Sequence, residues 1–146
     1  MSLKPRFAVW LLVVLLLIFA FLFYWNKVEP EAELTAYSVA KRRMLDWANH
    51  YRQVWIVRKY PESSVIEDQQ VNFNQYGWVL PGSESQPDCG QWFRLLHPEQ
   101  DVLGYRYFAI EDASLENGYQ CRYIFTERRK IVVTLEGEQF SVEIKS

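Results

Sequence analysis

The sequence predicts an α+β fold in which an N-terminal transmembrane helix continues into a second helix packed on an antiparallel β-meander, with one disulfide. Three observations predict this fold. Residues 7–25 are uncharged and mostly apolar, residues 31–60 repeat apolar side chains at helical spacing, and residues 105–145 alternate apolar with polar side chains. About 120 residues follow the first segment, which is enough for one domain with one core.

Residues 7–25 are expected to form a membrane anchor. As a helix they would span roughly 28 Å, close to the ~30 Å hydrocarbon core of a bilayer. Aromatic side chains, which favour the headgroup region, stand at its ends: Phe7, Trp10, Tyr24 and Trp25. A cleaved signal sequence and a buried core helix are the alternatives. A signal has a shorter apolar run and small residues at its cleavage site, whereas this run ends in bulky aromatic residues.

Basic residues beside the apolar run predict its orientation. Lys4 and Arg6 precede the run, whereas its far side begins with Lys27 among several glutamates. The positive-inside rule therefore makes residues 1–6 a cytoplasmic tail and places residues 26–146 outside the cytoplasm. The expected location is the bacterial inner membrane, crossed once, with a periplasmic domain.

Charge and cysteine content limit the function of the exported part. It carries all 18 acidic residues and the 16 basic ones less Lys4 and Arg6, so its net charge is about −4. This balance argues against a nucleic-acid partner. Cys89 and Cys121 form an isolated pair, which in an oxidising compartment indicates one disulfide. Free or redox-active cysteines are the alternative, although neither CxxC spacing nor an adjacent histidine supports them.

Residues 26–60 are predicted to form a juxtamembrane and periplasmic helix. Pro30 can kink this helix or open a new one, and Pro61 ends it. Its apolar residues fall into two neighbouring stripes: Leu34, Tyr37, Met44, Ala48, Tyr51 and Trp55 in one, and Ala36, Ala40, Trp47 and Val54 in the other. We expect this wide face to pack on the domain's own sheet, with a coiled coil to a partner as the alternative.

Residues 61–146 are predicted to be the β-rich part of the same domain. A short strand is expected near residues 71–73, and Asp88 can cap a short helix over residues 89–96 that Pro98 ends. The inner side of this helix is expected to hold Trp92, Leu95 and Leu96.

Four strands of a meander are expected after this short helix. They cover residues 105–110, 119–126, 131–135 and 139–145, with turns at Asn117-Gly118 and at residues 136–138. In the second strand, Tyr119, Cys121, Tyr123 and Phe125 share one face, which we expect to be the inner one. A disulfide from Cys121 to Cys89 would then tie the short helix or its loop to the sheet.

No catalytic, cofactor-binding or metal-binding motif is predicted. His50 and His97 lack the spacing of metal ligands, and neither a glycine-rich phosphate loop nor a nucleophile motif occurs. The many aromatic residues are expected to be mostly core, with Trp78 and Trp92 the candidates for an exposed docking patch. The residues proposed for partner contact are Leu34, Tyr37, Met44, Trp47, Tyr51, Trp55, Trp78 and Trp92.

Several sequence blocks carry a family resemblance. They are the helix from Ala40 to Trp55, the block Tyr76-Gly77-Trp78-Val79-Leu80-Pro81, the block Asp88-Cys89-Gly90-Gln91-Trp92, residues 95–96 and 100–104, and Cys121-Arg122-Tyr123. With an apolar first helix and a late disulfide, the chain resembles the type IV pilin class, and within it the MshF family of MSHA pilus biogenesis proteins.

This resemblance implies a non-enzymatic accessory or assembly component of pilus biogenesis in the inner membrane. Its implied partners are other pilus-assembly membrane proteins, pilins and the lipid bilayer, with neither nucleic acid nor a small-molecule substrate. Processed pilins are cleaved after a glycine and carry glutamate at the fifth mature position. Here Arg6 precedes Phe7, and Leu11 occupies that fifth position. An accessory role is therefore expected, with a minor pilin, a pseudopilin-like subunit, an anchored sensor or an envelope scaffold as alternatives.

Overall fold

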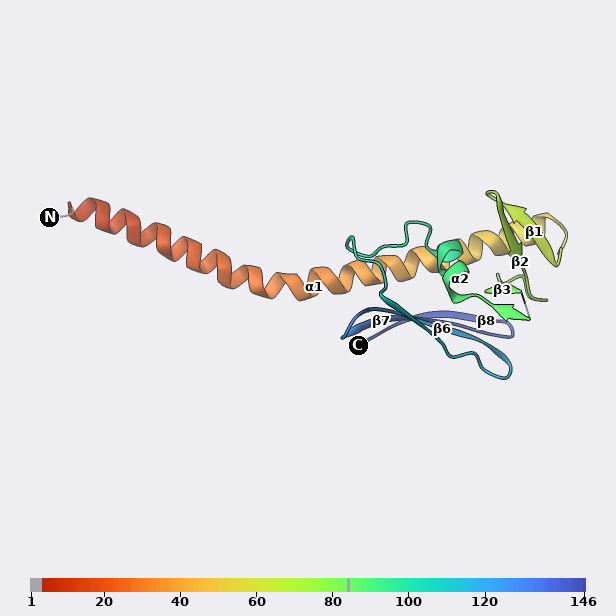
Figure 1. The fold of residues 1–146 in the computed structure, drawn as a ribbon. Helices are drawn as coiled ribbons and strands as arrows, with labels where there is room; N and C mark the ends of the chain where they lie inside the picture. Colours follow the sequence, from red (N-terminus) through yellow and green to blue (C-terminus); the bar gives the residue numbers. More distant parts are fainter. Residues whose placement is uncertain (1–3, 84) are drawn as a thin grey trace. The chain divides into compact units, whose positions relative to one another are not determined.

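The computed structural model describes residues 4–83 and 85–146. Its elements are α1 (Pro5–Val57), β1 (Ser63–Ile66), β2 (Gln69–Asn72), β3 (Gly82–Ser83), β4 (Gln86–Pro87), α2 (Cys89–Leu96), β5 (Ala109–Asp112), β6 (Gly118–Thr126), β7 (Arg129–Glu136) and β8 (Gln139–Lys145) (Figure 1). The chain divides into two compact units, Met1–Thr35 and Ala36–Ser146, and α1 contributes to both. The fold is α+β, as the sequence predicts.

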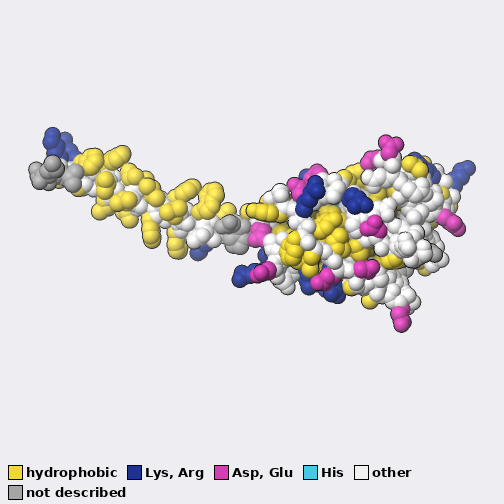
Figure 2. Space-filling view, in the orientation of Figure 1, with side chains coloured by type: hydrophobic (Ala, Val, Ile, Leu, Met, Phe, Trp, Pro, Cys, Tyr) yellow, Lys and Arg dark blue, Asp and Glu magenta, His cyan; other side chains and the backbone are white. Residues whose placement is uncertain are grey.

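The first unit consists of the N-terminal part of α1. By length and composition, α1 is able to cross a membrane, and none of its most apolar stretch is buried. Figure 2 shows apolar side chains covering the visible face of this part of the helix. The sequence predicts that Pro30 kinks the helix or opens a new one, and no new helix opens there, because α1 continues through this position as one element. Residues 7–25 and 26–57 therefore belong to the same helix.

In the second unit, one face of α1 enters the core. The buried residues follow one another at spacings of three and four: Tyr37, Ala40, Met44, Ala48 and Tyr51. The ring of Tyr37 lies edge-on to Phe125 of β6, with centroids 5.7 Å apart, and the Tyr51 hydroxyl donates to the Leu95 carbonyl at 2.9 Å. This confirms that the wide apolar face packs within its own domain.

Helix α2 forms where the sequence predicts it. The Asp88 side chain caps the helix by accepting a hydrogen bond from the Gln91 amide at 3.0 Å. Its inner side is buried, and Trp92 Nε1 donates to the Val79 carbonyl at 3.1 Å. Within the second unit, α2 and the C-terminal half of α1 lie over the same face of the four-stranded sheet (Figure 1).

The sheet is an antiparallel meander in the order β5-β6-β7-β8. Cys121 pairs with Val133, which in turn pairs with Val142, and these three residues are buried. Tyr123 and Phe125 are buried on the same side of β6 as Cys121. The predicted inner face of this strand is confirmed.

The first strand of the meander is not where the sequence places it, because residues 105–108 form part of a loop and β5 covers only Ala109–Asp112. Val102 and Tyr105 pair across a tight turn whose central residues, Leu103 and Gly104, both have positive φ. The Tyr107 ring then packs on Phe93 and Tyr123, with centroids 5.0 and 5.5 Å away. The turn and this inward ring delay the start of the strand.

A disulfide joins the two elements of the core that the sequence predicts it to join. Cys89, at the first position of α2, bonds to Cys121 of β6, and their Cα atoms are 5.7 Å apart. The Tyr123 hydroxyl donates to the Cys89 carbonyl at 2.5 Å. Helix α2 is therefore attached to the sheet by a covalent bond and by a hydrogen bond at the same residue.

Candidate functional site

Four of the eight residues predicted for partner contact belong to the core. The exposed fractions are 3% for Tyr37, 0% for Met44, 4% for Tyr51 and 0% for Trp92. The placement of Trp92 in an exposed docking patch is wrong, because α2 turns this side chain onto the sheet, where it meets Phe140 edge-on at 6.1 Å. These four residues stabilise the domain and present no surface to a partner.

The other four predicted residues retain some exposed surface. Leu34 is 48% exposed and lies in the first unit. Trp47 and Trp55 are half-buried, as is Trp78. Trp78 stacks on Phe140 at 5.3 Å, donates from Nε1 to the Glu138 carbonyl at 2.7 Å and lies 4.9 Å from the Arg52 guanidinium. These contacts fix Trp78 as part of the wall of the domain.

The most exposed aromatic side chains of the second unit include two that sequence reasoning missed. They lie in the α2–β5 loop, which we define as residues 97–108. Leu103 is 56% exposed, Tyr105 69% and Phe108 68%. Leu103 also lines a pocket of about 290 Å³ together with Val39 of α1. A run of exposed apolar side chains in one loop is typical of a surface that binds a partner.

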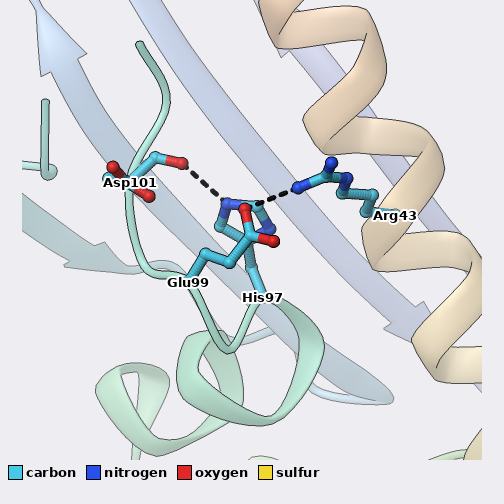
Figure 3. A network of polar contacts seen from close by, with 4 residues as sticks. All are labelled: Arg43, His97, Glu99 and Asp101. Atoms are coloured by element: carbon cyan, nitrogen blue, oxygen red, sulfur yellow. Dashed lines mark hydrogen bonds and ion pairs between the residues drawn. The ribbon is translucent and has the colours of Figure 1, made fainter. Parts of the chain in front are cut away.

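A polar network fastens this loop to α1 (Figure 3). His97 is buried, with 3% of its surface exposed, and its Nε2 donates to the Asp101 carbonyl at 2.8 Å. The Arg43 guanidinium of α1 binds a Glu99 carboxylate oxygen at 2.5 Å. The two contacts hold both sides of the turn that follows α2.

The same loop brings together three groups able to bind a metal ion. Ligand atoms of His97, Glu99 and Asp101 lie within 4.8 Å of one another. However, Arg43 already neutralises Glu99, and its positive charge opposes a cation at this position. His97 Nε2 is also occupied by a carbonyl. These contacts indicate that the three residues hold the loop in place and do not bind a metal ion. Their spacing along the chain, at every second residue, does not predict this role.

A larger groove lies where α1 ends. It has a volume of about 1040 Å³ and is bounded by the end of α1, the β1–β2 hairpin, the loop after β2 and the turns at the ends of β6 and β7. Aromatic rings and uncharged polar side chains line it: Trp55, Tyr60, Phe73, Tyr76 and Tyr119 supply rings, and Ser63, Asn72, Asn74, Gln75, Ser83, Ser85 and Asn117 supply amides and hydroxyls.

Two residues with left-handed backbone follow α1 at the edge of this groove. Lys59 and Tyr60 both have left-handed φ values, +63° and +62°, which cost about 1–2 kcal/mol each for residues with a side chain. The Tyr60 ring meets the Trp55 ring edge-on at 4.8 Å, yet 63% of Tyr60 is exposed. Helix α1 ends at Val57, whereas the sequence predicts that it continues to residue 60. The Tyr60 amide donates to the Trp55 carbonyl at 2.9 Å, so these two residues also close the end of the helix.

Glycine at position 77 leaves room for the Trp55 ring, which lines the groove. A Cβ at this position would lie 2.3 Å from Trp55 Cε3, and Gly77 has a φ of +85°. Only glycine satisfies both requirements without strain. The bare backbone of residue 77 therefore supports the indole ring.

Two tyrosines of the core have strongly perturbed hydroxyls. Burial, assisted by the nearby Glu67 charge, raises the pKa of Tyr51 to about 12. Burial, with smaller contributions from Tyr107, Asp88 and Asp112, raises the pKa of Tyr123 well above its usual value. Both hydroxyls stay protonated and donate to backbone carbonyls, so their role is to tie α1 and β6 to α2.

No protein-family model, curated protein or solved structure matches this chain.

Proposed function

We propose that this protein is a non-enzymatic, membrane-anchored accessory component of a type IV, MSHA-like pilus biogenesis system. Its second unit acts through protein–protein contacts outside the cytoplasm. The observation that carries this proposal is the α2–β5 loop, whose Leu103, Tyr105 and Phe108 are largely exposed on a domain attached to an apolar helix. The resemblance of the sequence to pilus biogenesis proteins is the reason for proposing this system.

The anchor and the loop have different roles in this proposal. An anchor confines the domain to the plane of the membrane and so raises its effective concentration near membrane-bound partners. Arg43 and His97 fasten residues 97–101 of the loop, and the amides of Tyr105 and Phe108 donate to the Val102 and Ile124 carbonyls. A loop that is ordered in this way loses less entropy on binding. The domain thus acts as a tethered, preorganised docking module.

The proposed compartment is the periplasm, with the anchor in the inner membrane. Lys4 and Arg6 before the apolar run favour a cytoplasmic N-terminus by the positive-inside rule. The Cys89–Cys121 disulfide is suited to an oxidising compartment. Because a cleavage glycine is absent before Phe7 and leucine occupies position 11, the accessory role is favoured over incorporation into the fibre.

Photocrosslinking tests this function at the loop itself. A photoreactive phenylalanine analogue in place of Phe108 is expected to yield a covalent adduct with a pilus-assembly membrane protein when cells are irradiated. The matched control places the same analogue at Ile56, which is 49% exposed on α1, and is expected to yield no such adduct. Phe108→Ala should lower the amount of co-purified partner about tenfold. Normal piliation in a deletion strain, or equal adducts at both positions, would contradict the proposal.

A further inference from the structure

The groove at the end of α1 takes no part in the proposed docking of the α2–β5 loop. We propose that this groove binds a neutral oligosaccharide. Its volume of about 1040 Å³ lies just above the usual range of small-molecule sites, which suits a short chain of linked sugar rings. The inference stands on the chemistry of its lining.

The aromatic side chains match the apolar faces of sugar rings. A pyranose ring presents C–H groups on its faces, and these pack on aromatic rings through dispersion and the negative charge of the π face. Tyr60 is 63% exposed and Trp55 is half-buried beside it. Tyr76 and Tyr119 add half-buried rings from two other segments. Several rings in one groove allow successive sugars to stack.

The polar side chains match the hydroxyl edges of sugar rings. Each sugar hydroxyl both donates and accepts, and side-chain amides and hydroxyls do the same. Gln75 and Asn117 are exposed lining residues with such amides, and Ser63 and Ser83 are exposed lining residues with hydroxyls. The groove therefore offers both kinds of contact that a sugar ring requires.

The charge of the lining selects an uncharged ligand. Among the lining residues that the structure describes, Glu62 alone has a charged side chain, and it is acidic. Phosphate and carboxylate groups are recognised chiefly by arginine and lysine, which this lining lacks within residues 4–83 and 85–146. A nucleotide, a phosphosugar or a polyuronate would find no basic side chain among these described lining residues.

The walls of the groove are held in place before any ligand binds. The Asn74 side chain accepts from the Tyr76 and Trp78 amides, both at 3.0 Å, and donates to the Gly137 carbonyl at 2.9 Å. Arg52 Nε donates to the Tyr76 carbonyl at 3.1 Å. A preformed site loses less entropy on binding than one that must be ordered.

A peptide is the less favoured occupant. Peptide capture by strand addition requires a free strand edge. Of the strand residues in this lining, Leu135 belongs to β7, which has a neighbour on each side. Ser63, Asn72 and Ser83 belong to two-stranded sheets whose strands are only two to four residues long, so the free edges that they offer are short. Such short edges give an added strand few backbone hydrogen bonds, so the lining favours a sugar over a peptide.

Calorimetric titration of the full chain in detergent micelles tests the proposal. The probes are cellotetraose and tetra-N-acetylchitotetraose, with tetragalacturonic acid as the charged counterpart and a proline-rich peptide as the competing class. We expect saturable binding of at least one neutral oligosaccharide. Tyr60→Ala should weaken this binding about tenfold or more, because truncation of a central aromatic contact typically has this effect.

Two control variants separate the groove from general stability. Tyr60→Phe keeps the ring and should bind within about twofold of the unaltered chain. Tyr105→Ala removes a tyrosine of similar exposure, 69%, outside the groove lining and should leave binding unchanged. Absence of saturable binding to both neutral oligosaccharides would overturn the proposal. So would equal binding by Tyr60→Ala, tighter binding of the acidic saccharide, or preferential binding of the peptide.

Discussion

Replacing Trp92 by alanine is expected to lower the free energy of unfolding of the domain by about 3–5 kcal/mol. Its side chain is fully buried between α2 and the sheet, so truncation leaves a large cavity. The Val79 carbonyl would also lose the hydrogen bond that it accepts from the indole. Denaturant unfolding of the full chain in detergent micelles, followed by near-ultraviolet circular dichroism, measures this change.

Two variants control for this result. Trp92→Phe keeps most of the buried ring and should cost less than the alanine variant, because it loses the indole hydrogen bond and only part of the volume. Phe108→Ala, at a residue that is 68% exposed, should change the stability by no more than about 0.5 kcal/mol. A loss below about 1 kcal/mol for Trp92→Ala would show that Trp92 is not the centre of the core.

Removing the disulfide is expected to be the second large effect. The double variant Cys89→Ser, Cys121→Ser releases a link between residues 32 apart in sequence. On the chain-entropy model, a loop of this size stabilises the folded state by about 3–4 kcal/mol. The same unfolding measurement applies, and the loss should appear as a lower denaturant midpoint.

Chemical reduction provides an independent check on the disulfide. Treating the unaltered chain with a thiol reductant should reproduce the loss of the double variant, whereas the reductant should leave the double variant itself unchanged. If the reduced chain and the double variant were both as stable as the oxidised chain, the disulfide would have no structural role.

The sequence predicts the elements whose signals are local. The stripe from Tyr37 to Tyr51 shows the helical period, and this period reports directly which side of α1 is buried. Asp88 before an apolar run predicts the start of α2 because the cap depends only on neighbouring residues. The alternation through Cys121 predicts the inner face of β6 for the same reason.

The predictions that failed depend on contacts between distant residues. Residues 105–110 have the composition of a strand, but the inward packing of Tyr107 on Phe93 and the turn at Leu103 replace its first half with a loop. Trp92 lies on the inner side of its short helix, as the sequence pattern predicts, and only its proposed place in a docking patch is wrong. That proposal is based on the nearby loops, whereas the sheet that covers this side chain forms later in the chain.

The groove lies outside the reach of sequence pattern for a similar reason. Trp55, Gln75 and Asn117 come from three separate segments, and only the folded chain brings them to one place. The left-handed φ values of Lys59, Tyr60 and Gly77 likewise become visible only in the structure. The aromatic composition predicts that some rings stay exposed, without indicating which ones.

Alkaline carbonate extraction of membranes tests the central claim, which is that residues 7–25 hold this domain in a membrane. Cells produce the full chain with a C-terminal epitope tag, and membranes are washed with carbonate before the pellet and supernatant are compared. The account predicts a full-length chain in the membrane pellet. A tagged chain in the soluble fraction, shortened by the apolar N-terminal segment, would contradict it.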